Sequence, residues 1–290
     1  HAAVAELPDH ALAFFTEWGS RTSYALRLAS LVGAGWVEVV DDYMPALALV
    51  LPAAVADGFA AFVSDAQEDD DVLYEYLCAT GVPMLVSSPN LVDHDDLPSV
   101  AGNEDHGFRK SACYVADDHP PPARSVLSGL TCVPYFSFMS GRASCQVRRT
   151  TRDRWARIPA EEVLAGHGFD DGTIDEATAM LATHIDGHAV VRQHVPQPLV
   201  RAVCMAALAL GACAADHGVD GSLDPAAHPV TDAALASLAP GGLRRFLNRR
   251  GLAEVSRRLR PMVLAAVRLG LRAADGKTAR IKYNSDSLLQ

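Results

Sequence analysis

The stretch Trp36-Val37-Glu38-Val39-Val40-Asp41-Asp42 decides the fold, because a run rich in β-favouring residues stops at two aspartates. Aromatic and β-branched residues favour strands, and Asp favours the turn that follows one. A second run of this kind, Met84–Ser88, continues through Pro89–Val92 to another acidic segment. We expect Trp36–Val40 and Met84–Ser88 to be interior strands of one sheet.

Helical patterns come before each of these strands. Ser20–Val32 places its apolar residues on one side of a helix, and Gly33 ends the pattern. Asp71–Thr80 does the same and ends at Gly81. Strands that alternate with helices over short loops are typical of an α/β fold. The first part of the chain therefore predicts a mixed or parallel sheet flanked by helices.

The second half of the chain predicts a β-hairpin followed by helices. Thr131–Phe138 and Ala143–Arg148 flank a short turn, as the two strands of a hairpin do. From Pro159 onward, helical segments are separated by Gly and Pro. We predict an α/β domain at residues 1–118, a linker and β-hairpin at 119–158, and a helical domain at 159–290 that packs separately.

The net charge of −10 is unevenly distributed. Residues 1–150 contain 8 Lys and Arg against 20 Asp and Glu, a balance of −12, whereas residues 151–290 contain 17 against 15, a balance of +2. An acidic half repels nucleic acid but suits a divalent metal ion, which can then carry a phosphate-bearing ligand. We expect no nucleic-acid partner.

The six cysteines and the apolar segments indicate the environment. No two cysteines form a CxxC pair, so a reduced, cytoplasmic chain is expected. The longest apolar segment, Ala202–Ala215, is shorter than the roughly 20 residues of a membrane span. It predicts a buried helix, and we expect no transmembrane segment.

Asp41, Asp42 and His94 are the candidate metal ligands. Asp41 and Asp42 follow a strand, at the edge of the sheet where ligands bind in α/β folds. His94 follows the second strand among three aspartates. If the two strands are parallel neighbours, their loops meet, and the three side chains face one cleft together with Asp70. The alternatives are an ordinary Asp-rich turn and an exposed histidine.

Three further groups are candidates for catalysis or ligand binding. Asp70 and Asp71 begin a helix, where a carboxylate can act as general base or simply cap the helix. Arg109 and Lys110 can neutralise a phosphate or be surface charges. Ser20 can cap the helix that it opens, whose free N–H groups can bind an anion.

The C-terminal helices are strongly basic. They predict a peripheral contact with a membrane surface, an anionic ligand or a protein, or else a solvated helix face. The residues concerned are Arg244, Arg245, Arg249, Arg250, Arg257, Arg258 and Arg260.

Four motifs, taken in order, resemble a family of bacterial, mainly actinobacterial, glycosyltransferase-like proteins. The resemblance covers about residues 10–115, and these proteins are similar to lipopolysaccharide-type transferases of the GT-A fold. The motifs are Trp18-Gly19-Ser20-Arg21-Thr22, the Trp36–Tyr43 stretch, Glu68-Asp69-Asp70-Asp71, and Pro89-Asn90-Leu91-Val92-Asp93-His94-Asp95-Asp96-Leu97-Pro98-Ser99.

The resemblance implies a partial GT-A sheet and a role for each motif. In GT-A enzymes a strand-end acidic motif holds Mn²⁺ or Mg²⁺ and the nucleotide diphosphate, a later acid at a helix start acts as base, and a histidine completes the metal shell. Asp70 or Asp71 matches the second role and His94 the third. Asp41-Asp42 resembles the first motif, although only 40 residues precede it.

Two functions follow from the resemblance. The first is metal-assisted transfer of a sugar from a nucleotide-sugar donor to an acceptor hydroxyl. The second is a non-catalytic binding or partner protein on a degenerate glycosyltransferase scaffold. Because a GT-A donor half spans on the order of 100 residues, either Asp41-Asp42 belongs to the acceptor side or the donor motif lies upstream. We favour the second, which predicts weak nucleotide-sugar binding.

Overall fold

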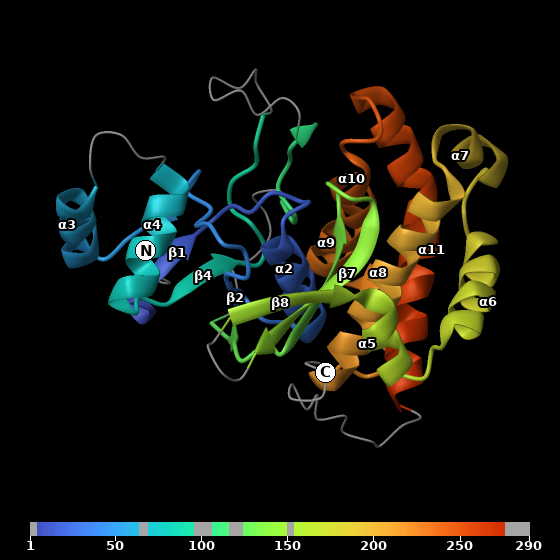
Figure 1. Ribbon diagram of the computed structural model, residues 1–290, viewed down its shortest axis with the longest axis horizontal. Helices are drawn as coiled ribbons and strands as arrows, with labels where there is room; N and C mark the ends of the chain where they lie inside the picture. Colours follow the sequence, from blue (N-terminus) through green and yellow to red (C-terminus); the bar gives the residue numbers. More distant parts are fainter. Residues whose placement is uncertain (1–4, 64–68, 96–105, 116–123, 150–153, 276–290) are drawn as a thin grey trace.

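The computed structural model describes residues 5–63, 69–95, 106–115, 124–149 and 154–275 (Figure 1). Two β-sheets and a set of helices form a mixed α/β fold, as the sequence predicts. The predicted proline-rich linker at 119–122 lies outside the described residues.

The larger sheet has five strands in the order β3-β1-β4-β2-β5. β1 pairs in parallel with β4, and β2 pairs in parallel with β5, whereas the β1–β3 and β2–β4 pairs are antiparallel. The strands are β1 (Ala11–Ala13), β2 (Trp36–Glu38), β3 (Leu49–Val50), β4 (Met84–Ser87) and β5 (Val126–Leu127).

The two strands predicted from the sequence are interior neighbours in this sheet, which confirms that prediction. Their direction is a correction, because β2 and β4 run antiparallel with Val37 opposite Val86. Their carboxyl ends therefore lie at opposite edges of the sheet. The direction of the strands therefore does not bring together the loops that follow β2 and β4.

Three helices accompany this sheet: α2 (Arg21–Val32), α3 (Ala53–Phe62) and α4 (Asp69–Thr80). The Ser20 side chain caps α2 by accepting a hydrogen bond from the Ser23 amide, and Gly33 ends the helix at φ 74°. Glycine suits that left-handed conformation because it has no Cβ. The helix predicted at Ser20–Val32 is thus confirmed.

The second sheet is antiparallel, with strands β6 (Cys132–Ser137), β7 (Arg142–Arg149) and β8 (Arg154–Pro159) in that order. β6 and β7 form the predicted hairpin, with Pro134 opposite Cys145. The sequence did not predict β8, which extends the hairpin to three strands.

Helices follow from residue 160 to residue 275 of the described chain. α8 and α11 pack closely at two glycines, since a Cβ at Gly211 would lie 2.1 Å from the Val267 carbonyl oxygen and one at Gly270 would lie 2.1 Å from that of Leu208. The helices are α5 (Ala160–Gly166), α6 (Asp171–Ala182), α7 (His188–His194), α8 (Gln197–Asp216), α9 (Pro229–Ala236), α10 (Leu238–Leu243) and α11 (Arg249–Asp275), with a 3₁₀ turn, η2 (Pro225–Ala227).

α8 is the one described helix that is long and apolar enough to cross a membrane, yet 78% of its most apolar window is buried inside the protein. Core helices of soluble proteins pass the same test of length and composition.

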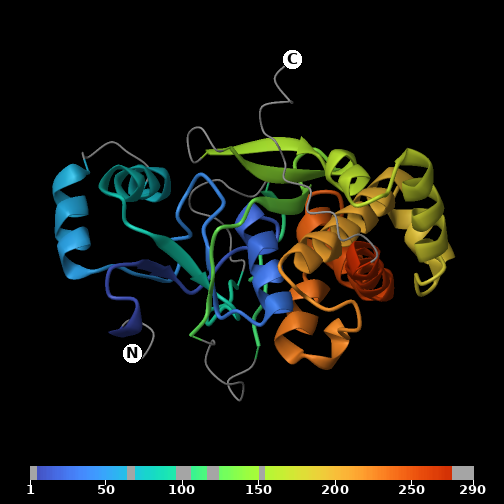
Figure 2. The same cartoon turned by 90° about the horizontal axis from the view of Figure 1, so that it is seen from below.

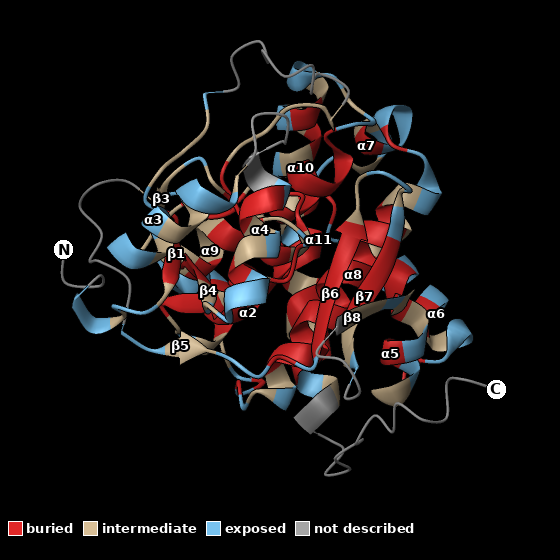
Figure 3. Cartoon of the chain, turned by 60° about the vertical axis from the view of Figure 1, so that its left-hand side comes forward, coloured by how far each residue is buried: buried red, intermediate tan, exposed pale blue. Residues whose placement is uncertain are grey.

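The hydrophobic core is continuous from the first sheet into the helical region, which therefore does not pack separately. α2 lies between the five-stranded sheet and the C-terminal helices (Figure 2). Its fully buried Arg27 donates to the Ala234 carbonyl oxygen and the Ser237 hydroxyl, and so ties α2 to α9. Figure 3 shows the buried α2, α8 and β6 at the centre and the more exposed α3 at the periphery.

Candidate functional site

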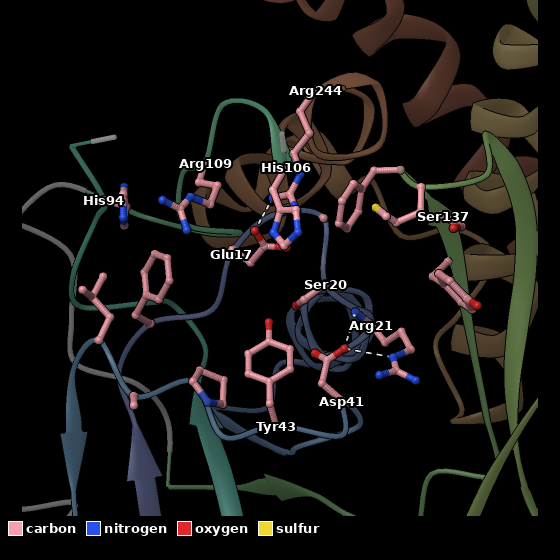
Figure 4. Close-up of a pocket in the computed structure, with 18 of the residues that line it drawn as sticks. Glu17, Ser20, Arg21, Asp41, Tyr43, His94, His106, Arg109, Ser137 and Arg244 are labelled. Atoms are coloured by element: carbon pink, nitrogen blue, oxygen red, sulfur yellow. Dashed lines mark hydrogen bonds and ion pairs between the residues drawn. The ribbon is translucent and has the colours of Figure 1, made fainter. Parts of the chain in front are cut away.

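A pocket of about 860 Å³ lies where segments from both halves of the chain meet. Its walls come from the segment after β1, the start of α2, the loop after β2, the segment after β4, the β6–β7 hairpin, β8 and the residue after α10 (Figure 4). No single local motif builds this pocket. It depends on the shared core described above.

The Asp41 carboxylate binds the first backbone amides of α2. One carboxylate oxygen accepts hydrogen bonds from the backbone amide and the Nε of Arg21, both at 3.0 Å, and the other accepts from the Thr22 amide at 2.9 Å. The side chain is only 4% exposed. The sequence predicts that the free N–H groups of this helix can bind an anion, and the structure places the Asp41 carboxylate there.

Arg21 joins the two aspartates of the predicted motif, because its guanidinium also forms an ion pair with Asp42. Burial lowers the pKa of Arg21, but the charges of Asp41 and Asp42 outweigh that effect and raise the pKa above its ordinary value. The Asp42 side chain is 78% exposed and does not line the pocket. The two adjacent aspartates therefore occupy different environments.

Arg244 reaches the pocket from the helical region and forms an ion pair with Glu17 (Figure 4). Its side chain is 1% exposed, and its Cζ lies 3.8 Å from the centre of the Phe138 ring. Within the described part of the chain, its Nε has no hydrogen-bond acceptor. Gly241 allows α10, which ends directly before Arg244, to pack closely against the Trp18 backbone, since a Cβ at Gly241 would lie 2.2 Å from the Trp18 carbonyl oxygen.

His94, His106 and Arg109 line the same pocket as Asp41. The His94 ring lies 6.0 Å from that of Phe15, and the His106 ring lies 6.2 Å from that of Phe138. Asp41 and His94 thus face one cavity even though their strands are antiparallel. The segments that follow β2 and β4, rather than the direction of the two strands, bring Asp41 and His94 to the same pocket.

Lys110 does not line the pocket but pairs with Asp93 at 3.0 Å. Burial raises the pKa of Asp93, yet hydrogen bonds from Ser111 and Lys110 outweigh it, so the pKa lies below its usual value. Of the two predicted phosphate-binding residues, Arg109 therefore lines the pocket, whereas Lys110 forms an ion pair with Asp93 outside the pocket lining.

Asp70 and Asp71 lie in the first turn of α4, as predicted. Asp71 is exposed and does not line the pocket, and the side chain of Asp70 lies outside what the structure describes. In the described residues α4 supplies no wall of the pocket.

The predicted metal ligands do not fit a metal site. Among the described residues, no three His, Cys, Asp or Glu side chains gather where they could hold a metal ion. Asp41 already uses both of its oxygens on Arg21 and Thr22, and the Arg21 cation lies where a metal would bind between Asp41 and Asp42. We therefore assign no chemical step to a metal.

Tyr43 adds a neutral donor to the pocket wall. Burial raises the pKa of its hydroxyl well above the ordinary value, and the charges of Asp41 and Glu17 raise it further. The hydroxyl therefore stays protonated at neutral pH and interacts with the Ser20 side chain.

The charge of the lining is positive. Four arginines face two carboxylates, and both carboxylates are already ion-paired. Phe15, Tyr135 and Phe138 supply aromatic rings. The sequence analysis gives no site role to Glu17, Tyr43, His106 or Arg157 and does not place Arg244 in a pocket. The Gly241-Gly242 pair before Arg244 is the signal there, because adjacent glycines indicate close packing.

The sequence matches no protein-family model and no curated protein, and no solved structure matches the chain.

Proposed function

We propose that this chain is a glycosyltransferase-like protein that binds a nucleotide sugar in the pocket and transfers the sugar to an acceptor hydroxyl. The observation that carries the proposal is the lining: Arg21, Arg109, Arg157 and Arg244 against Glu17 and Asp41, with aromatic rings between them. Arginines match the geometry of phosphate oxygens, and rings stack on bases and sugars.

In this proposal the arginines offset the charge of the leaving diphosphate. The two carboxylates are held by arginines, so we give the role of proton acceptor to a histidine, His94 or His106. The sequence predicts weak nucleotide-sugar binding, but four arginines line the pocket, so we propose micromolar affinity instead.

One observation favours a second candidate, a non-catalytic protein that binds the same ligands. Glu17 and Asp41, the carboxylates of the pocket, are both neutralised by arginines, and a carboxylate general base needs to be free to accept a proton.

A coupled binding and release assay separates the two candidates. The protein is titrated calorimetrically with a panel of nucleotide sugars, and then each binder is incubated with simple sugar alcohols as acceptors while free nucleoside diphosphate is measured. Binding with release supports the transferase, and binding without release supports the second candidate. No binding to any member of the panel contradicts both.

A further inference from the structure

The seven arginines that the sequence groups as one basic face divide into three sets in the structure. Arg244 is buried in the pocket wall. Arg258 and Arg260 form ion pairs, with Asp186 and Glu254 and with Asp232 respectively. The remaining four are exposed and, in the part of the chain that the structure describes, make no ion pair: Arg245, Arg249, Arg250 and Arg257.

Three of these arginines, Arg245, Arg249 and Arg250, lie in one short exposed segment that also carries Phe246 and contacts Met139 through Arg245. We call these five residues the rim patch. Arg245 donates to the Met139 sulfur at 3.1 Å. Phe246 packs against the β6–β7 turn, since a Cβ at Gly141 would lie 3.2 Å from its ring. Met139 is 53% exposed and Phe246 41% exposed.

The rim patch adjoins the pocket. Met139 lines the pocket. The side chain of Arg244 forms part of the pocket wall (Figure 4), and Arg244 directly precedes Arg245. The Cζ of Arg249 lies 4.5 Å from the centre of the Phe108 ring, and Phe108 stands in the sequence between the pocket residues His106 and Arg109.

The rim patch is basic on an acidic protein. The chain carries a net charge of −10, yet no acidic residue occurs between Asp232 and Glu254. Exposed arginines beside exposed apolar side chains suit a surface that offers negative charge over an apolar interior. An anionic lipid bilayer has that order of layers, whereas a nucleic acid offers no apolar layer beneath its phosphates.

We infer that the rim patch docks the protein on an anionic membrane. Arg245, Arg249 and Arg250 contact the lipid phosphates, and Phe246 and Met139 enter the boundary between head groups and acyl chains. The docked bilayer then lies against the rim of the pocket, where a lipid-borne molecule reaches it without leaving the membrane. The inference does not depend on which ligand the pocket binds.

Sedimentation with vesicles tests the inference. The protein is mixed with vesicles of equal parts phosphatidylglycerol and phosphatidylcholine, and separately with vesicles of phosphatidylcholine alone. We expect binding to the first only, weakening as salt screens the charges. The R245Q/R249Q/R250Q variant should bind about fivefold more weakly per arginine, roughly a hundredfold in all.

A matched control removes three exposed arginines elsewhere. R149Q/R192Q/R272Q changes the net charge equally and should bind like the wild type. The inference is wrong if this control loses as much binding as the rim variant, or if the wild type binds neutral vesicles equally well.

Phe246→Ser separates a membrane from other polyanions. Its vesicle binding should fall while far-ultraviolet circular dichroism shows an unchanged fold, because the apolar contact is lost. A protein that ignores vesicles but binds a DNA duplex, with or without Phe246, overturns the inference in favour of a nucleic-acid contact.

Discussion

Arg244, which directly follows α10, forms an ion pair with Glu17, which follows β1, and the pair links the helical region to the first sheet inside the pocket wall. The two residues are 227 positions apart in sequence. Their side chains are 1% and 15% exposed, so each charge depends on the other for compensation.

Glu17→Gln should therefore destabilise the protein strongly. It leaves the Arg244 cation buried without its counter-charge, which costs about 3–5 kcal/mol of unfolding free energy. Urea denaturation measures the loss. The double variant Glu17→Gln/Arg244→Met should recover much of the stability because it removes both charges. Equal instability of the single and double variants would contradict the account.

Asp41→Asn and Asp42→Asn should differ sharply although the residues are adjacent. Asp41 holds the start of α2 through three hydrogen bonds, so its loss should cost about 1–3 kcal/mol. Exposed Asp42 should change stability by about 0.5 kcal/mol or less. Thermal unfolding measured with and without Mn²⁺ tests this. A Mn²⁺-induced stabilisation that both variants abolish would restore the two aspartates as metal ligands.

Asp93 should contribute stability that disappears in acid. Its pKa is lowered in the folded protein, mainly because hydrogen bonds from Ser111 and Lys110 outweigh its burial. The contribution is complete above the unfolded pKa of about 3.9 and is lost as the pH falls through the lower folded value. Asp93→Asn should therefore be less stable than wild type at pH 7, and the gap should close in strong acid. A gap that widens on acidification would refute the assignment.

Replacement of the pocket histidines should affect turnover more than affinity. If one of them accepts the proton of the acceptor, either His94→Asn or His106→Asn should lower turnover by about 10²- to 10⁴-fold with little change in donor affinity. Asp71→Asn is the matched control, because Asp71 is exposed and outside the pocket lining, and it should turn over like the wild type. Loss of activity in the control with none in either histidine variant would return the base role to α4.

The sequence predicts the local elements of this fold well, because their signals are local. The strand-forming run at Trp36, the capping Ser20 and the terminating Gly33 each act within a few residues. The direction of β2 against β4 depends instead on how the segment between them, with β3, α3 and α4, makes the crossing from one strand to the other. No short stretch of residues encodes that crossing.

The site was only partly predictable for the same reason. Asp41, His94 and Arg109 come from motifs that the sequence singles out, and they do line the pocket. Arg244 and Arg157 arrive from the other half of the chain through the shared core. The sequence also gives no reason to treat the adjacent Asp41 and Asp42 differently. In the structure they differ because the Asp41 carboxylate binds the first amides of α2, whereas the Asp42 side chain is exposed.

Calorimetric titration of a nucleotide sugar in the presence of EDTA tests the central claim most directly, with wild type, Arg109→Gln and Lys110→Gln compared. The account predicts micromolar binding by the wild type without added metal, about 10- to 100-fold weaker binding by Arg109→Gln, and wild-type binding by Lys110→Gln, whose side chain lies outside the pocket lining. No binding by the wild type, or equal affinity of all three proteins, would contradict it.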